Sequence, residues 1–294
     1  MSRDSKAVAY GLATVLLWST VASAFKLSLK HLQPAQLVLW AALTSTVVLA
    51  LILLVQGRLR AALSVAPRVW LVSAGFGALN PGLYYLVLFE AYDRLPAQEA
   101  QALNYTWAIT LTLLSVPLLK RAITLRDVVA ALFCYAGAVV IATRGALGSL
   151  ELSDGLGVGL ALGSTVIWAL YWILSTKDPR DPVSGQLLSF ASAVPMIAAY
   201  LWAQGELSLP SLPGLMGAAY VGTFEMGIAF VLWLTAMKLT SSTARISNLI
   251  FISPLLSLGI ISALLDEPIL RSTLYGLGLI LVGLATQQLV GRRA

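Results

Sequence analysis

Charged residues are scarce in this chain, and so are the two residue types that most often build metal and catalytic centres. Only 11% of the 294 residues are charged, whereas a soluble domain carries about 25%. There is one cysteine, Cys134, and one histidine, His31. A disulfide scaffold, a cysteine-rich metal site and a histidine-based zinc site are therefore excluded, and a Ser-His-Asp triad is disfavoured.

Apolar residues take the place of the missing charges. Hydrophobic residues make up 59% of the chain, and its mean hydropathy is +0.86. No water-soluble fold of this size could bury so much apolar surface, so the sequence predicts an all-α integral membrane protein whose surroundings are the lipid bilayer. The net charge of +6 is read as a signal of membrane orientation, with no nucleic-acid partner.

Ten apolar runs approach the roughly 20 residues that a membrane-spanning helix needs. They cover residues 7–29, 35–56, 69–92, 96–119, 124–143, 155–177, 184–204, 213–237, 240–265 and 272–290. The first run is too long for a signal peptide and lacks a clean cleavage site. No intervening loop is long enough for a soluble domain.

The distribution of Lys and Arg predicts which way the spans run. With ten spans and the N terminus inside, thirteen Lys and Arg face the cytoplasm and five face outward, namely Lys26, Lys30, Arg94, Arg144 and Arg271. This split predicts an inner-membrane protein with both termini in the cytoplasm.

The two halves of the sequence resemble each other. Trp18 aligns with Trp168, Gly77 with Gly222, Gly82 with Gly227 and Asn104 with Asn248. A repeat of five spans turns its second copy upside down in the membrane, so residues 1–145 and 146–294 would form two inverted five-helix repeats. Such repeats favour a carrier that works by alternating access around a midplane site, although any duplicated membrane protein could inherit the same pattern.

The second half carries a family resemblance. The stretches Ala236-Met-Lys-Leu-Thr-Ser-Ser-Thr-Ala-Arg245, Ser253-Pro-Leu-Leu256 and Leu265-Asp-Glu-Pro268, followed by a glycine-bearing helix, resemble the EamA repeat of the drug/metabolite transporter superfamily. The length, the Trp-rich first helices and Asn80-Pro81 are most similar to the YddG-like branch of amino-acid exporters. The resemblance implies ten helices in two EamA repeats and export of a small molecule. The first half departs from the pattern at Thr110 and at Lys120-Arg121-Ala122.

Glu225 is the only acid in the middle of a span. An ionised carboxylate at that depth costs about 2.5–3.5 kcal/mol, so Glu225 should face a wet cavity or a partner, or be protonated. Its counterpart in the first repeat is Asn80, and Tyr84, four residues after Asn80, would share a helix face with it. The alternative is a protonated Glu225 that bonds to a neighbouring helix as structural glue.

We expect a central substrate cavity with apolar walls and a few hydrogen-bonding groups. Its predicted lining residues are Trp18, Asn80, Tyr84, Gln101, Asn104, Tyr105, Trp168, Glu225, Arg245 and Asn248. For Arg245 a side chain that reaches back to the cytoplasmic surface is an equal alternative. The small-residue tract Gly155, Gly159 and Gly163 predicts a helix-packing seam, with a sliding surface for the conformational change as the alternative.

The leading hypothesis is a secondary transporter that exports amino acids or related metabolites without a cofactor. An exporter of drugs or organic cations is the alternative within the same superfamily. An intramembrane enzyme lacks a catalytic constellation, and a channel is disfavoured by the repeat. Glu225 could carry a coupling proton, and a uniporter is equally compatible. A monomer is compatible with the sequence.

Overall fold

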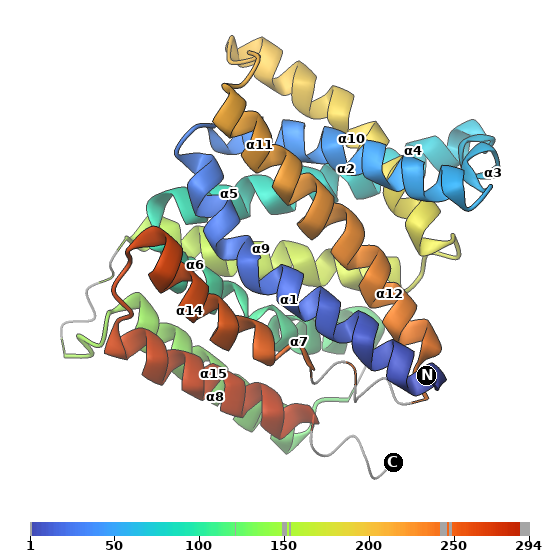
Figure 1. Cartoon of the computed structure of the whole chain (residues 1–294). Coiled ribbons are helices and arrows are strands. Elements are labelled where there is room, and N and C mark those ends of the chain that lie inside the picture. Colours follow the sequence, from blue (N-terminus) through green and yellow to red (C-terminus); the bar gives the residue numbers. More distant parts are fainter. Residues whose placement is uncertain are drawn as a thin grey trace. The chain divides into compact units, whose positions relative to one another are not determined.

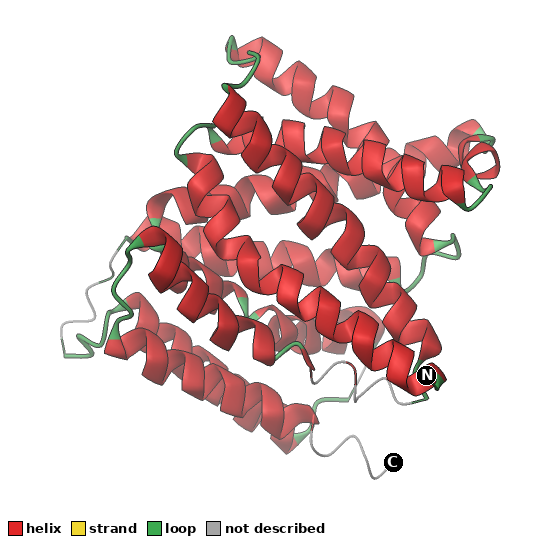
Figure 2. Ribbon diagram, in the orientation of Figure 1, coloured by secondary structure: helices red, strands yellow, loops and turns green. Residues whose placement is uncertain are grey.

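The computed structural model describes residues 2–120, 122–148, 152, 154–241, 246 and 249–288. Within these ranges every regular element is a helix (Figure 2). In chain order the elements are α1 (Arg3–Leu29), α2 (Pro34–Val55), α3 (Leu59–Leu63), α4 (Pro67–Gly77), η1 (Ala78–Leu83), α5 (Tyr84–Arg94), α6 (Ala97–Asn104), α7 (Trp107–Leu119), α8 (Leu125–Ala142), α9 (Gly155–Ser175), α10 (Pro182–Gln204), α11 (Leu212–Tyr220), η2 (Val221–Ala229), α12 (Phe230–Leu239), α14 (Ile252–Leu265) and α15 (Arg271–Gln288). The labels η1 and η2 mark π-helical segments.

Eight helices among the described residues are long and apolar enough to cross a membrane. They match the first eight predicted runs, with η1 and η2 inside the third and eighth of them. The apolar helices α14 and α15 lie in the ninth and tenth predicted runs and are shorter. The prediction of an all-helical membrane protein is therefore confirmed, and a total of ten spans stays a prediction.

Capping residues set the helix boundaries. Proline occupies the first turn of α2, α4 and α10, where its missing N–H has no helical partner to lose. Side-chain oxygens of Asp154 and Asp181 accept backbone N–H groups at the start of α9 and α10. Gly205 ends α10 with a φ of 74°, a left-handed conformation that glycine adopts without steric cost. These signals are local, which is why the predicted boundaries lie close to the observed ones.

The helices form two compact units, and each unit draws on both halves of the sequence. Unit 1 contains residues 1–89 and 179–253, and unit 2 contains residues 90–178 and 254–294. The predicted division at residue 145 concerns the sequence repeat, and that repeat does not coincide with the compact units.

Unit 1 is held together by polar links at both ends of its helices. At the end that carries the N terminus, Arg58 pairs with Asp181 at 3.0 Å and Asp4 accepts the Ser241 N–H at 2.8 Å. At the opposite end, Gln36 Nε2 donates to the Glu206 carbonyl at 3.0 Å. These links show that α2 and α10 run in opposite directions, and that α4–η1–α5 runs opposite to α11–η2–α12.

In unit 2, α8 and α15 lie side by side (Figure 1). A Cβ on Gly276 would lie 2.6 Å from the Gly137 carbonyl oxygen, and a Cβ on Gly283 would lie 2.7 Å from that of Ala130. The two helices are therefore antiparallel and pack backbone against backbone.

The glycine tract at the start of α9 does not form the predicted seam. A Cβ added at Gly159 or Gly163 would meet nothing within 4 Å, whereas one at Gly157 would lie 2.8 Å from the Leu95 side chain. The expectation that Gly155, Gly159 and Gly163 pack against a helix is therefore wrong, because Gly157, on another face of α9, makes the close contact.

Candidate functional site

Two long helices of unit 1 carry a π-helical segment near their middle. These are η1, between α4 and α5, and η2, between α11 and α12. The backbone of η1 is broken at Asn80, whose φ of −144° and ψ of 115° are extended. Broken or π-helical segments within spans free backbone groups from the helix ladder and are frequent at functional sites.

The aligned glycines explain why both irregularities fit into the packed unit. A Cβ on Gly77 would collide with the Ser189 carbonyl on α10, and a Cβ on Gly222 would collide with the Ala41 carbonyl on α2. At the other end of each segment, a Cβ on Gly82 or Gly227 would lie 3.0 Å from the carbonyl oxygen of the glycine five residues earlier. Gly77 and Gly222 therefore permit a neighbouring helix to approach closely. Gly82 and Gly227 permit the wider turn of the π-helical segment.

Glu225 lies within η2, and its two carboxylate oxygens differ in their hydrogen bonding. The Tyr85 hydroxyl donates to its Oε1 at 3.1 Å, while its Oε2 is buried without a hydrogen-bond partner. On the next residue, the Met226 carbonyl accepts a hydrogen bond of 2.7 Å from Gln186 Nε2 on α10. The Tyr85 hydroxyl thus positions the carboxylate, and the hydrogen bond from Gln186 holds the adjacent backbone of η2 against α10.

Two buried amide oxygens of unit 1 also lack hydrogen-bond partners. Asn80 is 4% exposed and Gln186 is 5% exposed, and neither the Asn80 Oδ1 nor the Gln186 Oε1 has a hydrogen-bond partner. Buried polar groups are normally paired, so unit 1 has acceptors on η1, η2 and α10 with capacity for a donor. An ammonium group is a donor of that kind, with three N–H groups and no acceptor.

Aromatic rings lie beside these polar groups. Tyr84 packs edge-on against Tyr85, with 4.8 Å between ring centroids, and Phe25 on α1 contacts the Tyr85 ring from another helix. The predicted site residue Trp18 packs against Trp233, at 5.2 Å between centroids. The tyrosine that bonds Glu225 is therefore part of a cluster of aromatic rings.

Four predicted site residues lie in unit 2. Asn104 ends α6, and Tyr105 stands in the interruption between α6 and α7. Asn104 Nδ2 donates to Ser164 Oγ on α9 at 3.0 Å. Trp168, one turn further along α9, stacks on Tyr171 with 5.4 Å between centroids, and Gln101 on α6 is buried. The C-terminal end of α6, which carries Asn104, therefore contacts α9 where α6 and α7 are interrupted.

The remaining two predicted residues, Arg245 and Asn248, lie outside the described residues. Of the eight that are described, Trp18, Asn80, Tyr84 and Glu225 belong to unit 1, whereas Gln101, Asn104, Tyr105 and Trp168 belong to unit 2. The sequence prediction missed Tyr85, Gln186 and Ser164. A signal for Gln186 was present, because it is a polar residue inside an apolar run, as Asn80 is.

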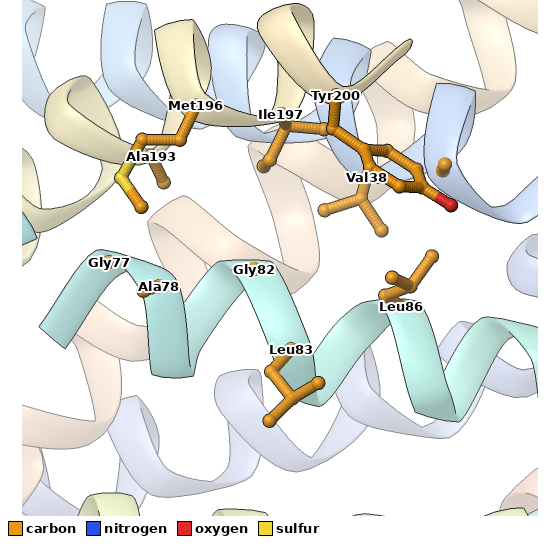
Figure 3. Close-up of a pocket in the computed structure, with 11 residues that line it drawn as sticks. Val38, Gly77, Ala78, Gly82, Leu83, Leu86, Ala193, Met196, Ile197 and Tyr200 are labelled. Atoms are coloured by element: carbon orange, nitrogen blue, oxygen red, sulfur yellow. The ribbon is translucent and has the colours of Figure 1, made fainter. Parts of the chain in front are cut away.

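An apolar pocket of about 220 Å³ lies beside η1. Figure 3 shows Gly77, Gly82 and Leu86 along one wall, with Ile197 and Tyr200 of α10 facing them. Its lining contains no charged side chain. This pocket therefore offers nothing to balance the charges of a polar substrate, and the polar groups around Glu225 are the better candidate. Within the described residues no cluster of three His, Cys, Asp or Glu side chains could hold a metal ion.

Both halves of the chain match one known protein family. Residues 5–143 and 155–286 match the EamA-like transporter family. The chain belongs to the EamA-like transporter family. It is thus a multi-pass membrane transporter of the drug/metabolite superfamily, and the predicted family is confirmed.

Relatives of this EamA transporter are named as transporters. It is 30% identical over 241 residues, 81% of each chain, to the aromatic amino acid exporter YddG of Ancylobacter novellus. It is 24% identical over 220 residues, 74% of this chain and 70% of the other, to the uncharacterised transporter YvbV of Bacillus subtilis. A solved crystal structure covers 98% of both chains at 24% identity with a TM-score of 0.69, which supports the fold.

The Glu-Pro motif of this EamA transporter has a structural role in unit 2. Glu267 Oε1 accepts the N–H of Ala97 at 3.2 Å, and the side chain of Gln98 donates to the Pro268 carbonyl at 2.8 Å and accepts the Leu270 N–H at 3.1 Å. The carboxylate thus caps the N-terminus of α6, where a negative charge is favourable. The motif fixes the helix that ends at Asn104.

Proposed function

We propose that this EamA transporter exports amino acids, with aromatic ones preferred, as a secondary carrier. The observation that carries the proposal is the carboxylate of Glu225, whose Oε2 is buried and unpaired while its Oε1 accepts a hydrogen bond from Tyr85, a member of an aromatic cluster. A substrate ammonium group would supply the donors, and an apolar or aromatic side chain would pack against the rings. The name of the relative from Ancylobacter novellus supports this class of substrate.

Alternating access between two inverted five-helix repeats is part of the proposal. Its support is that corresponding helices of the two halves run in opposite directions inside each unit: α4–η1–α5 against α11–η2–α12 in unit 1, and α8 against α15 in unit 2. Broken spans near the middle of the helices are typical of such carriers. On this proposal α14 and α15 complete a set of ten spans.

The proposed orientation puts both termini in the cytoplasm of a cell whose inner membrane holds the protein. Among the described residues of unit 1, seven Lys and Arg lie toward the end with the N terminus, namely Arg3, Lys6, Arg58, Arg60, Arg68, Arg180 and Lys238, and two, Lys26 and Lys30, lie toward the other end. Cytoplasmic ends of spans carry the excess of positive charge.

The proposal is tested by flux into proteoliposomes that contain the purified full-length protein. A panel of radiolabelled amino acids is compared, with L-phenylalanine and L-tryptophan expected to show saturable uptake and counterflow. Linear uptake without saturation would indicate a channel instead. Repeating the assay with an imposed pH gradient, for the wild type and for Glu225→Gln, separates a proton-coupled carrier from a uniporter.

An exporter of organic cations is the second candidate, and the unpaired acceptors of unit 1 favour it as well. The two candidates differ in whether the substrate carboxylate is recognised. Phenylethylamine has the ammonium group and the ring of phenylalanine but lacks the carboxylate. If phenylethylamine is transported as well as phenylalanine, the cation exporter is the better description, whereas a strong preference for phenylalanine supports the amino-acid exporter.

A further inference from the structure

Helix α10 contacts both π-helical segments of unit 1. A Cβ on Gly77, directly before η1, would collide with the Ser189 carbonyl of α10 and lie 3.2 Å from the Ala193 Cβ, and Figure 3 shows Ala193 on the wall opposite Gly77. Three residues before Ser189, the Gln186 side chain donates a hydrogen bond of 2.7 Å to the Met226 carbonyl of η2. Residues three or four apart are neighbours on a helix surface, so one face of α10 reaches both η1 and η2.

Gln186 is a polar residue in an apolar stretch of α10. It is buried, and so are the apolar residues around it, Val183, Leu187 and Leu188. Counted from the proline that begins each helix, the corresponding residue of α2 is Val38, which lines the apolar pocket beside η1. The two halves of the chain thus differ at this position, with an apolar side chain next to η1 and a hydrogen-bonding one next to η2.

Only the donor half of the Gln186 amide is used. Its Nε2 donates to the Met226 carbonyl, whereas its Oε1 is buried without a hydrogen-bond partner. A buried acceptor without a partner costs stability, and buried polar groups are normally paired. An apolar side chain would avoid that cost, so stability alone does not favour glutamine here. The benefit of Gln186 lies in the bond that it donates.

That bond acts directly beside the candidate site. Met226 follows Glu225, whose Oε1 accepts a hydrogen bond from Tyr85 and whose Oε2 is unpaired. Within a membrane span, side chains of neighbouring helices satisfy carbonyls that an irregular segment frees. A fixed Met226 carbonyl restricts the backbone that carries the carboxylate. Binding groups need such support, because they must be held within about 0.5 Å of the productive geometry.

We propose that Gln186 is a positioning residue of the substrate site. Through its hydrogen bond, α10 holds η2 in the position that directs Glu225 toward the substrate, and the contact at Ser189 joins the same helix to η1. A displacement of η1 is then transmitted to η2 through α10. This role rests on the proposed transport at Glu225, and it assigns Gln186 no contact with the substrate.

Hydrogen exchange tests the positioning without any substrate. Gln186→Met keeps a similar side-chain length, lacks the donor and also removes the unpaired oxygen. Backbone amides of residues 221–229 in the purified full-length protein should therefore exchange roughly fivefold faster, the factor given by a hydrogen bond of ordinary net strength, with little change in Tm. Unchanged exchange in η2 would overturn the proposal. A large fall in Tm with faster exchange throughout unit 1 would also overturn it, because the role would then be purely structural.

Further variants separate the donor from the bulk of the side chain. Gln186→His offers an N–H at a similar reach, so exchange in residues 221–229 should return toward the wild-type rate, and a rate as high as in Gln186→Met would contradict the role of the donor. If Gln186→Met does not fold, Gln186→Asn, whose shorter side chain withdraws the donor, gives the same comparison. Ser192→Ala is the matched control, because it removes a side-chain hydrogen bond within α10, to the Leu188 carbonyl, and should leave exchange in η2 unchanged.

Uptake into proteoliposomes connects the positioning to transport. Gln186→Met should lower kcat/KM for the transported amino acid by a similar factor. Because Gln186 acts through Glu225, adding Gln186→Met to Glu225→Gln should cause little further loss. Reduced uptake with unchanged exchange in η2 would mean that Gln186 contacts the substrate itself, which contradicts the proposal. If the wild type transports no amino acid, the proposed function fails, whereas the exchange comparison still decides whether Gln186 positions η2.

Discussion

The hydroxyl of Tyr85, the second residue of α5, donates a hydrogen bond of 3.1 Å to Oε1 of Glu225 in η2. The two residues are 140 positions apart in the chain and come from the two halves of the sequence. Their contact lies within unit 1. It joins the two spans of that unit that each carry a π-helical segment. It is the one hydrogen bond that fixes the orientation of the mid-span carboxylate among the described residues.

Removing that hydroxyl should impair transport more than folding. Tyr85→Phe keeps the ring that packs on Tyr84 and Phe25 but leaves the carboxylate without its donor. A hydrogen bond to a charged group contributes about 1.5–3 kcal/mol, so uptake at low substrate concentration should fall by roughly tenfold or more. Initial rates in proteoliposomes measure this change. Tyr200→Phe removes a hydroxyl from a half-exposed position on α10 and should leave the rate unchanged.

The spacing from Asn80 predicts Tyr84 as a site residue, whereas the hydrogen bond to Glu225 comes from Tyr85. That prediction requires Asn80 and Tyr84 to share one face of a regular helix, as residues four apart do. The backbone of Asn80 is extended, so the helical register does not continue from Asn80 to α5. The residue that reaches Glu225 is then the next one. Hydropathy predicted where the spans lie, but it carries no information on a local change of register.

Glycines provide a second case in which periodicity alone was insufficient. The spacing of Gly155, Gly159 and Gly163 suggested a seam, yet the closest helix approaches occur at Gly77, Gly222 and Gly276. Spacing shows which residues share a face and leaves open whether another helix covers that face. The aligned pairs Gly77/Gly222 and Gly82/Gly227 were visible as a repeat, whereas their role at the π-helical segments depends on the neighbouring helices.

Alanine substitutions should separate these two groups of glycines. Gly222→Ala would drive a methyl group into the Ala41 carbonyl and close to the Thr44 side chain, and overpacking of this kind costs about 1–3 kcal/mol. Gly75→Ala is the matched control, because its Cβ would meet nothing within 4 Å and alanine favours a helix. The Tm in detergent should therefore fall for Gly222→Ala only. A normal Tm for that variant would contradict the close approach of α2 to η2.

A buried acid in unit 2 predicts an asymmetry between two charge-removing variants. The Glu99 side chain is fully buried, whereas Arg144, which donates to it at 2.7 Å, is 49% exposed. Arg144→Gln would deprive a buried carboxylate of its cation, which is the costly way to break such a pair. Glu99→Gln leaves a half-exposed guanidinium that water can solvate. Thermal unfolding should show the larger loss of stability for Arg144→Gln, and equal losses would show that the pair behaves as a surface pair.

The last prediction concerns the acid at the start of α10. Partial burial acts to raise the pKa of Asp181, but hydrogen bonds from the Ser184 N–H and hydroxyl, together with the Arg58 guanidinium, outweigh it and hold the pKa below the ordinary value of 3.8. A carboxylate with a lowered pKa stabilises the folded state fully at pH values above 3.8, and the stabilisation is lost as the pH falls through the folded-state pKa.

Asp181→Asn should therefore have an effect that depends on pH. Asparagine can still cap the helix, because its side-chain oxygen accepts the Ser184 N–H, but it cannot pair with Arg58 or release a proton. At neutral pH the variant should have a lower Tm than the wild type, and the difference should shrink as the pH is lowered from about 4. Arg58→Gln should reduce the same pH-dependent difference, since it removes one of the groups that lower the pKa. A Tm difference that stays constant from pH 7 to the acid limit of folding would show that Asp181 acts through its shape alone.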